Sequence, residues 1–164
     1  MAELVSEGAL SLDSSSGQLL PYEKAKPSDL LWCDGLAVGS PTYAGLMTGR
    51  LKLLFGELVA EVLGKVEGEL ACAFSSTGGR GDGAELTCLA ILSMLLNFGF
   101  LVFGVPAYTG SEQTLHYRAE AIGSSQAGAG EEGCRRLGRR LAEYCALLLY
   151  GQSEAHPQKQ PYRR

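Results

Sequence analysis

Three apolar runs constrain what this chain can fold into, because none of them alternates polar with apolar residues. They read "GLAVGS" (35–40), "ELACAFSS" (69–76) and "FLVFGVP" (100–106), and helix-forming segments separate them. A strand that is apolar along its whole length is buried on both faces, which is typical of a parallel sheet with helices on each side. The predicted fold class is therefore α/β.

Periodic apolar residues predict the helices of such a fold. Apolar residues recur at helical spacing from Thr48 to Leu63. The segment from Ala84 to Phe98 is apolar almost all round, so we expect it to be largely covered. The remaining predicted elements are helices at 2–12 and 131–150, one helical turn from Pro27, a short strand "QLLPY" at 18–22, and a flexible linker at 124–133.

Composition narrows the class of protein. A chain of 164 residues that is 46% hydrophobic can bury one core, and it carries no apolar run near the ~18 to 20 residues of a membrane span. A formal net charge of −4 gives no general attraction to nucleic acid. The N-terminus does not resemble a signal peptide, and five scattered cysteines among apolar residues suit buried thiols in a reducing compartment. We therefore expect a cytoplasmic protein with no membrane span and no metal site.

Two loops follow predicted strands and carry small and polar residues. They read "GSPTYAG" (39–45) and "SSTGGRGDG" (75–83). In open α/β sheets, ligands bind beyond the carboxyl ends of the strands, and glycine amides there can approach a ligand closely. The second loop has neither the GxGxxG pattern nor a Walker A sequence, so the glycines alone do not identify the ligand.

Together, these loops and their flanking elements resemble a known superfamily. The stretch "DGLAVGSPTYAGLMTGRLKLLF", followed by "GKVEGELACAFSSTGGRGDGAELTCLAILSMLLNFGFLVFGVPAY", resembles the flavodoxin-like superfamily. Within it the resemblance is strongest to the WrbA-type NAD(P)H:quinone oxidoreductases, and it extends from Ala2 to about Tyr150. It implies a flavodoxin-like doubly wound parallel sheet in three α/β/α layers, with FMN at the point where the strand order reverses.

The resemblance also implies which residues contact the flavin, while it implies no catalytic side chain and no metal ligand. FMN would receive hydride from a nicotinamide nucleotide at N5 and pass electrons to a quinone-like acceptor. Asn97 in "LLNFG" stands where family members often carry a histidine, and would make a polar contact near the ring. The first loop would lie along the ring and the second at its pyrimidine end and ribityl chain, which gives as site residues Pro41, Thr42, Tyr43, Ala44, Ser75, Ser76, Thr77, Gly78, Gly79 and Asn97.

One departure from the family pattern concerns the N-terminal end. The family's first strand and its Ser/Thr-Gly-Asn-Thr phosphate loop would precede "MAELVSEGA" and are not in this sequence. We therefore expect an N-terminally truncated flavodoxin-like domain over 1–150, a disordered tail over 151–164, and weak binding of FMN. The family resemblance further implies a homo-oligomer.

Two functions follow from these expectations. The first is an FMN-dependent NAD(P)H:quinone-type oxidoreductase or a flavodoxin-like FMN-binding protein. The second is a non-catalytic remnant or truncated gene product that acts at most as a binding or assembly module. Other chemistry has less support, because no GxSxG turn accompanies His116 or His156, and Asp82 and Glu85 beside a helix start favour its dipole.

Overall fold

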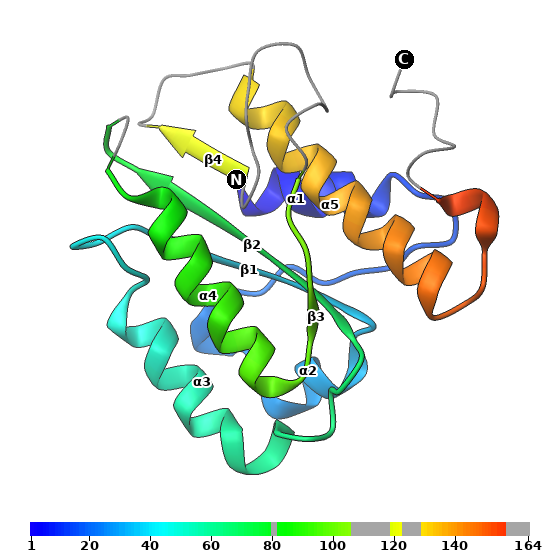
Figure 1. Cartoon of the computed structure of the whole chain (residues 1–164), viewed down its shortest axis with the longest axis horizontal. Coiled ribbons are helices and arrows are strands. Elements are labelled where there is room, and N and C mark those ends of the chain that lie inside the picture. The colour runs from blue at the N-terminus through cyan, green and yellow to red at the C-terminus, as the bar shows by residue number, and fades with distance from the viewer. Residues whose placement is uncertain (80–81, 106–118, 123–128, 157–164) are drawn as a thin grey trace.

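A computed structural model describes residues 1–79, 82–105, 119–122 and 129–156 of the chain (Figure 1). Helices and strands alternate along most of this length, as the apolar runs predict. In chain order the elements are α1 (Ala2–Leu10), the 3₁₀ helix η1 (Tyr22–Lys24), α2 (Pro27–Trp32), β1 (Gly35–Pro41), α3 (Gly49–Val62), β2 (Leu70–Thr77), α4 (Ala84–Phe98), β3 (Leu101–Val102), β4 (Ala119–Ile122), α5 (Ala129–Leu148) and the 3₁₀ helix η3 (Ser153–Ala155).

The strands form one parallel sheet around β2. β1 pairs with β2 along its whole length, from Gly35 opposite Leu70 to Pro41 opposite Ser76. β3 and β4 also pair with β2, at residues 70–71 and 74–77 respectively. Since β1 occupies one edge of β2 throughout, β3 and β4 lie end to end along the other edge. Among the described residues, β1 has no strand on its outer edge.

Different helices cover the two faces of the sheet. Ala71 and Ala73 of β2 face a core with α2, α3 and α4, in which Phe55 and Phe98 meet edge to face with 5.5 Å between ring centroids. Leu70 and Cys72 face the opposite way, into a smaller core with α1 and α5. The α/β class and the parallel sheet with helices on both faces are confirmed.

Most predicted elements are confirmed within a few residues, and two are wrong. Residues 18–21 form no strand, and the 3₁₀ helix η1 follows instead. Residues 100–105 of the predicted strand at 100–106 are described, and only Leu101 and Val102 among them are regular. β4, for which the sequence predicts no strand, pairs with the rest of this edge of β2. An apolar run in the sequence does not show that the chain leaves the edge of β2 after β3, or that a later segment, β4, pairs with the rest of that edge.

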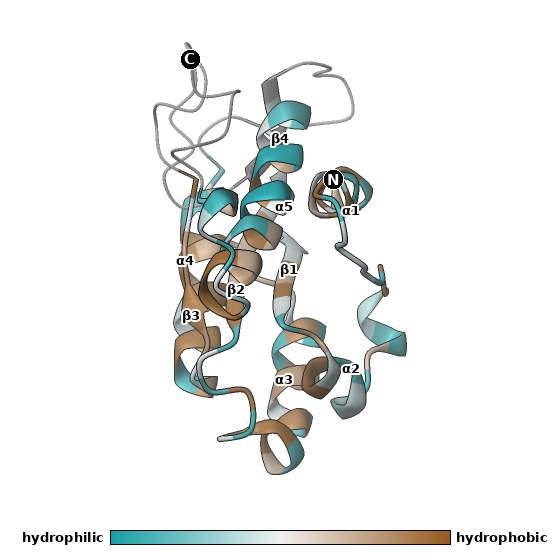
Figure 2. Cartoon of the chain, turned by 90° about the vertical axis from the view of Figure 1, so that its right-hand side faces the viewer, coloured by the Kyte–Doolittle hydropathy of each residue, from teal (hydrophilic) through white to brown (hydrophobic). Residues whose placement is uncertain are grey.

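The prediction that α4 is largely covered holds for its inner side only. Its inner residues are buried, but Leu86, Leu89 and Leu96 are 58%, 41% and 58% exposed. In Figure 2, apolar brown predominates on α4, whereas much of α5 is teal. The sheet covers only one side of α4, and no described element lies over the other.

The predicted tail begins with regular structure. Gln152 donates its backbone N–H to Ala146 at 2.9 Å, and Ala155 in η3 is buried. The Tyr150 hydroxyl donates to Asp34 Oδ2 at 2.7 Å, which ties the end of α5 to the start of β1. Residues 157–164 of the predicted tail lie outside the described residues.

Two glycines allow α1 to lie directly on α5. A Cβ on Gly138 would overlap the carbonyl oxygen of Val5, and one on Gly8 would overlap that of Arg135. Ion pairs flank this contact: Arg135 Nε lies 3.1 Å from Glu7 Oε2, and Arg139 Nε lies 2.9 Å from Glu143 Oε1. The backbones of the two helices are therefore in contact, which larger side chains would prevent.

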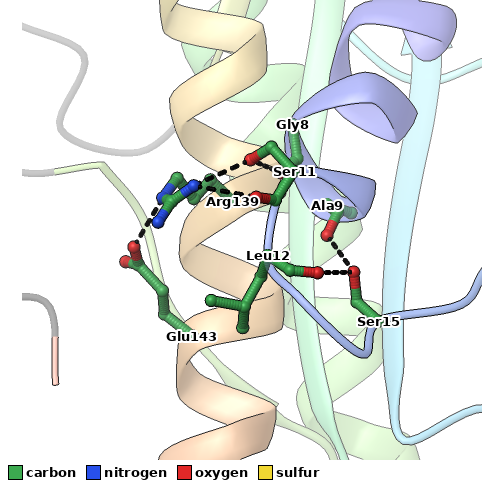
Figure 3. A network of polar contacts seen from close by, with 7 residues as sticks. All are labelled: Gly8, Ala9, Ser11, Leu12, Ser15, Arg139 and Glu143. Atoms are coloured by element: carbon green, nitrogen blue, oxygen red, sulfur yellow. Dashed lines mark hydrogen bonds and ion pairs between the residues drawn. The ribbon is translucent and has the colours of Figure 1, made fainter. Parts of the chain in front are cut away.

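Polar contacts then fix the end of α1 (Figure 3). Arg139 Nη1 donates to both the carbonyl oxygen and the hydroxyl of Ser11, each at 3.1 Å. The Ser15 hydroxyl lies 2.7 Å from the carbonyl oxygens of Ala9 and Leu12. These bonds satisfy carbonyl groups that the end of a helix leaves without partners.

The glycine contact predicts a large difference between two glycine-to-alanine substitutions. Gly138→Ala should lower the free energy of unfolding by about 1 to 3 kcal/mol or more, because the new methyl group forces α1 away from α5. Gly56→Ala is the control, since nothing lies within 4 Å of a Cβ there, and it should raise stability by up to about 1 kcal/mol. Urea denaturation measures both, and equal stabilities would contradict the close contact.

The cysteines predict slow thiol chemistry in the folded protein. All five are free, and burial raises the pKa of Cys33 and Cys134 to about 11 and of Cys145 to about 12. Thiols ionise near pH 9 when unfolded, so the folded state keeps its protons longer and stability should fall as the pH rises above about 9. Labelling with a disulfide reagent at neutral pH should be slow in native protein and fast in guanidinium. Rapid native labelling of the fully buried Cys72 or Cys88 would contradict this packing.

Candidate functional site

The two loops singled out in the sequence lie side by side at the carboxyl ends of β1 and β2. Pro41 and Ser76 are opposite each other in the sheet, and the Thr42 N–H donates to the Ser76 carbonyl oxygen at 2.8 Å. Gly45 of the first loop lies against Gly83 of the second, since a Cβ on Gly83 would be 3.5 Å from the Gly45 Cα. The sheet therefore brings both loops to one site.

The first loop is a tight turn that exposes its aromatic residue. Tyr43 and Leu46 exchange backbone hydrogen bonds of 3.0 and 3.1 Å. The two residues between them are left-handed, with φ of 50° at Ala44 and 79° at Gly45, as in the two-residue turns of hairpins. Tyr43 is 67% exposed, so its ring has no part in the core.

The hydroxyl groups predicted to contact a ligand are instead bonded to one another. Thr42 Oγ1 lies 2.8 Å from Ser75 Oγ and 2.9 Å from Thr87 Oγ1, and Ser75 Oγ lies 2.9 Å from the Ser40 carbonyl oxygen. Ser75 is fully buried. This hydroxyl cluster, Thr42, Ser75 and Thr87, fastens β1, β2 and α4 together where the loops begin. Ser40 Oγ adds a link to α3 by accepting the Thr48 N–H at 3.0 Å.

The second loop offers backbone groups more than side chains. The Thr77 hydroxyl donates to the Gly79 carbonyl oxygen at 3.0 Å and is buried. A Cβ on Gly79 would lie 3.0 Å from Asp82 Oδ2, so this carboxylate stands beside a backbone with no side chain. The Ser76 hydroxyl makes no hydrogen bond with the described residues, which leaves it free for a ligand. Residues 80 and 81 lie outside the described part of the chain.

Asn97 does not join the other predicted site residues. It lies near the end of α4, whereas the second loop leads into the start of this helix. Thirteen residues at 1.5 Å each separate Asn97 from Ala84 by about 20 Å. A group held between the two loops is therefore out of reach of Asn97. His116 lies outside the described residues.

Thr87 is a further residue of the site that is not among the predicted ones. It lies in the first turn of α4, 0% exposed, and its hydroxyl accepts from Thr42. The available signal was a threonine near the start of an otherwise apolar helix that follows the second loop. A buried hydroxyl in such a helix needs a partner, and the neighbouring strand ends are the nearest source of one.

Among the described residues, no three His, Cys, Asp or Glu side chains are grouped as metal ligands would be. No described helix combines the length and the apolarity needed to cross a bilayer.

The hydroxyl cluster predicts a stability effect at the site. Thr42→Val removes one hydroxyl and leaves Ser75 and Thr87 without that partner in a buried place, so it should cost about 1 to 3 kcal/mol of unfolding free energy. Ser76→Ala is the matched control and should change stability by less than about 0.5 kcal/mol. Urea denaturation compares the two, and a Thr42→Val variant as stable as Ser76→Ala would show that the cluster contributes nothing.

Comparison with known proteins gives consistent similarities. No family model matches the chain. The chain is 50% identical over 154 residues to a protein named flavodoxin from Aquifex aeolicus, and the alignment covers 94% of this chain and 83% of that protein. It is 34% identical over 142 residues to an NAD(P)H dehydrogenase (quinone) from Caulobacter vibrioides, covering 77% of this chain and 70% of that protein.

Solved structures share the fold at lower sequence identity. A flavodoxin from the domain Archaea has a TM-score of 0.64 and 23% identity, and the match covers 87% of this chain and 86% of that one. A WrbA-like flavodoxin from Agrobacterium tumefaciens also has a TM-score of 0.64, at 19% identity, and the match covers 87% of this chain and 85% of that one.

Proposed function

Because the chain belongs to the flavodoxin family, we propose that it is a flavoprotein that binds FMN between its two loops and acts as an electron carrier. The observation that carries this proposal is the exposed Tyr43 ring, which a strained turn presents beside the glycine-rich second loop. An aromatic residue with no role in the core, next to bare backbone, suits the binding of a flat ring with a polar edge.

Some residues at the site contact the ligand in this proposal, and others hold the two loops in place. Tyr43 stacks on the ring or lines its edge, and Pro41 and Ala44 stiffen and narrow the loop beside it. The amides of Gly78 and Gly79 donate to the polar edge, where the absence of side chains allows close approach. Thr42, Ser75 and Thr77 hold the loops through the hydrogen bonds described above, and the Ser76 hydroxyl is free to bond the ligand.

When bound, FMN supplies a ring that accepts and returns electrons, and the surrounding groups tune it. The sequence of the second loop contains both Arg80 and Asp82, and the Asp82 carboxylate lies beside Gly79. The chain itself therefore contributes binding, orientation and electrostatics.

A quinone reductase activity is the second candidate, and the similarity to the Caulobacter vibrioides protein favours it. In that case the chain would also bind a nicotinamide nucleotide and a quinone. Reduction of benzoquinone by FMN-loaded protein with NADH or NADPH tests this function, with Tyr43→Ala as the comparison. A protein that binds FMN but consumes neither nucleotide is a carrier only, and one that binds no flavin is the non-catalytic module.

Two substitutions test the flavin site directly. Tyr43→Ala removes ring contact worth about 0.5 to 1.5 kcal/mol, so it should weaken FMN binding by about 2- to 13-fold without loss of stability. Gly79→Val should also weaken binding, because its side chain fills the place of backbone approach and meets Asp82. Fluorescence titration of FMN measures both. Trp32→Ala, which removes an exposed aromatic at the far end of β1, is the control and should bind as the parent does.

The same titration with riboflavin separates ring from phosphate. The sequence of the two loops contains one cationic side chain, Arg80, and hydrogen bonds to a charged group contribute about 1.5 to 3 kcal/mol each. We expect FMN and riboflavin to bind with affinities within about tenfold of each other, which corresponds to no more than one such bond. A preference for FMN of a thousandfold would show a phosphate site outside these loops.

A further inference from the structure

The hydroxyl group of Thr87 connects α4 to a distant part of the chain. Thr87 lies in the first turn of α4 and is fully buried, so it is out of contact with a ligand held between the two loops. A threonine inside a helix commonly bonds the carbonyl oxygen four residues before it. The Thr87 hydroxyl accepts a hydrogen bond from Thr42, which is 45 positions away in the sequence and belongs to the first loop. This side chain therefore joins two separate parts of the site.

The backbone of Thr87 is bonded to the second loop. Its N–H donates to the Gly83 carbonyl oxygen at 3.1 Å, which is the hydrogen bond that begins α4. Gly83 is both the residue that caps this helix and the last residue of the second loop. Thr87 thus holds one end of each loop, with its side chain bonded to the first loop and its backbone to the second.

The two loops also meet directly at a pair of glycines. A Cβ on Gly83 would lie 3.5 Å from the Gly45 Cα and 4.0 Å from the Gly45 carbonyl oxygen, so the two backbones pass with no side chain between them. Together with the two bonds of Thr87, this contact closes a circuit around the segment from Thr42 to Gly45. Tyr43 belongs to that segment, and its backbone is held on both sides.

We propose that Thr87 sets the separation and the tilt of the two loops and is thereby a positioning residue for the ring of FMN, an inference that rests on the proposed flavin site. The other bonds of Thr42 are to one strand: its N–H donates to the Ser76 carbonyl oxygen at 2.8 Å, and its hydroxyl lies 2.8 Å from Ser75 Oγ. Contacts with a single strand leave a loop free to tilt out of the sheet. The contact with α4 comes from the helical layer and removes this freedom.

A flat ring between two loops needs a gap of constant width. A gap that is wider by about 0.5 to 1 Å already loses about a quarter to a half of the dispersion attraction between the atoms on its two sides. The Tyr43 side chain is exposed, so core packing does not hold its ring in place. Thr87 therefore acts on the bound ring through the backbone on either side of Tyr43.

Two substitutions separate this role from a role in core packing. Thr87→Val keeps the shape of the side chain and loses the hydroxyl, whereas Thr87→Ser keeps the hydroxyl and loses the methyl group. In Thr87→Val a carbon atom replaces an oxygen that lies 2.9 Å from Thr42 Oγ1, and carbon contacts need about 3.5 Å or more, so the first loop has to move away from α4. Ser75 still offers the Thr42 hydroxyl a partner, which limits the loss of overall stability.

Amide hydrogen exchange of the ligand-free protein tests the positioning itself. The Tyr43 and Leu46 amides are bonded to each other's carbonyl oxygens across the turn. Thr87→Val should raise their exchange rates by about 2- to 13-fold, as expected for the loss of one hydrogen bond, and Thr87→Ser should restore the rates of the parent. Ile91→Val is the control, because it removes a buried methyl group from the same side of α4 and should leave both rates unchanged.

Fluorescence titration of FMN tests the consequence for binding. Thr87→Val should weaken FMN binding by about 2- to 13-fold, the cost of ordering one more side chain, whereas Thr87→Ser and Ile91→Val should bind as the parent does. Since Thr87 acts through Thr42, adding Thr87→Val to Thr42→Val should cause no further loss. A residue with an independent effect on binding would instead give additive losses.

The two measurements distinguish failure of this inference from failure of the flavin site. Unchanged exchange at Tyr43 and Leu46 in Thr87→Val would overturn the inference, and so would additive losses with Thr42→Val. A Thr87→Ser variant as impaired as Thr87→Val would assign the residue to packing alone. A parent that binds no FMN would overturn the flavin site and the role toward the ring, and the exchange rates would still decide whether Thr87 holds the two loops.

Discussion

The contact between the backbones of α1 and α5 determines how one face of the sheet is closed. Gly8 and Gly138 let each helix touch the carbonyl oxygens of the other, and this brings Val5 down onto Leu70 and Cys72 of the central strand. No described strand leads into α1, so its position depends on α5 and on the Arg139 contacts at its end. The two glycines allow this close packing, because packing density depends on how well the two surfaces fit each other and not on the size of their side chains.

The central strand β2 connects this face of the sheet to the candidate site. β2 has pairing partners on both edges, and its last residues alternate between the two cores. Ser75 points toward α4 and joins the hydroxyl cluster, while Ser76 points the other way. The loops are thus held by groups that are satisfied inside the protein, and the groups left for a ligand are an aromatic ring, a serine hydroxyl and glycine amides. This separation between support and contact is what a preformed binding site requires, since a supporting hydroxyl cannot also bond the ligand at full strength.

Much of this arrangement could be predicted from the sequence, for identifiable reasons. The bounds of α4 follow from its apolar run between Gly83 and Gly99, and both glycines are left-handed at the helix ends. The start of α3 follows from Thr48, whose side chain accepts the Leu51 N–H. The sequence predicts that the two loops share one site, because parallel strands end at the same edge of a sheet.

The features that the sequence does not predict share a different cause, because each depends on what lies across space from the residue. The division of the third strand position between β3 and β4 depends on where the chain leaves and rejoins the edge of β2. The family resemblance implies Asn97 as a site residue, and only the fold shows that it lies near the end of α4, about 20 Å from the start of that helix. The sequence also does not show that Ser75 and Thr42 bond to each other, because a hydroxyl in a loop and a hydroxyl in a buried cluster look the same in one sequence. The local sequence pattern predicts the helices and strands, whereas the partners of the polar groups can be seen only in the folded structure.

The inner side of α4 links the candidate site to the core of the protein. Thr87 accepts a hydrogen bond from Thr42, one residue from Tyr43, and the same helix packs Cys88, Ile91 and Leu95 into the core beside β2. The position of the first loop therefore depends on the packing of α4. Ordering of a binding loop before the ligand arrives lowers the entropy that the ligand must overcome, so the core contributes to ring binding through a residue that does not touch the ring.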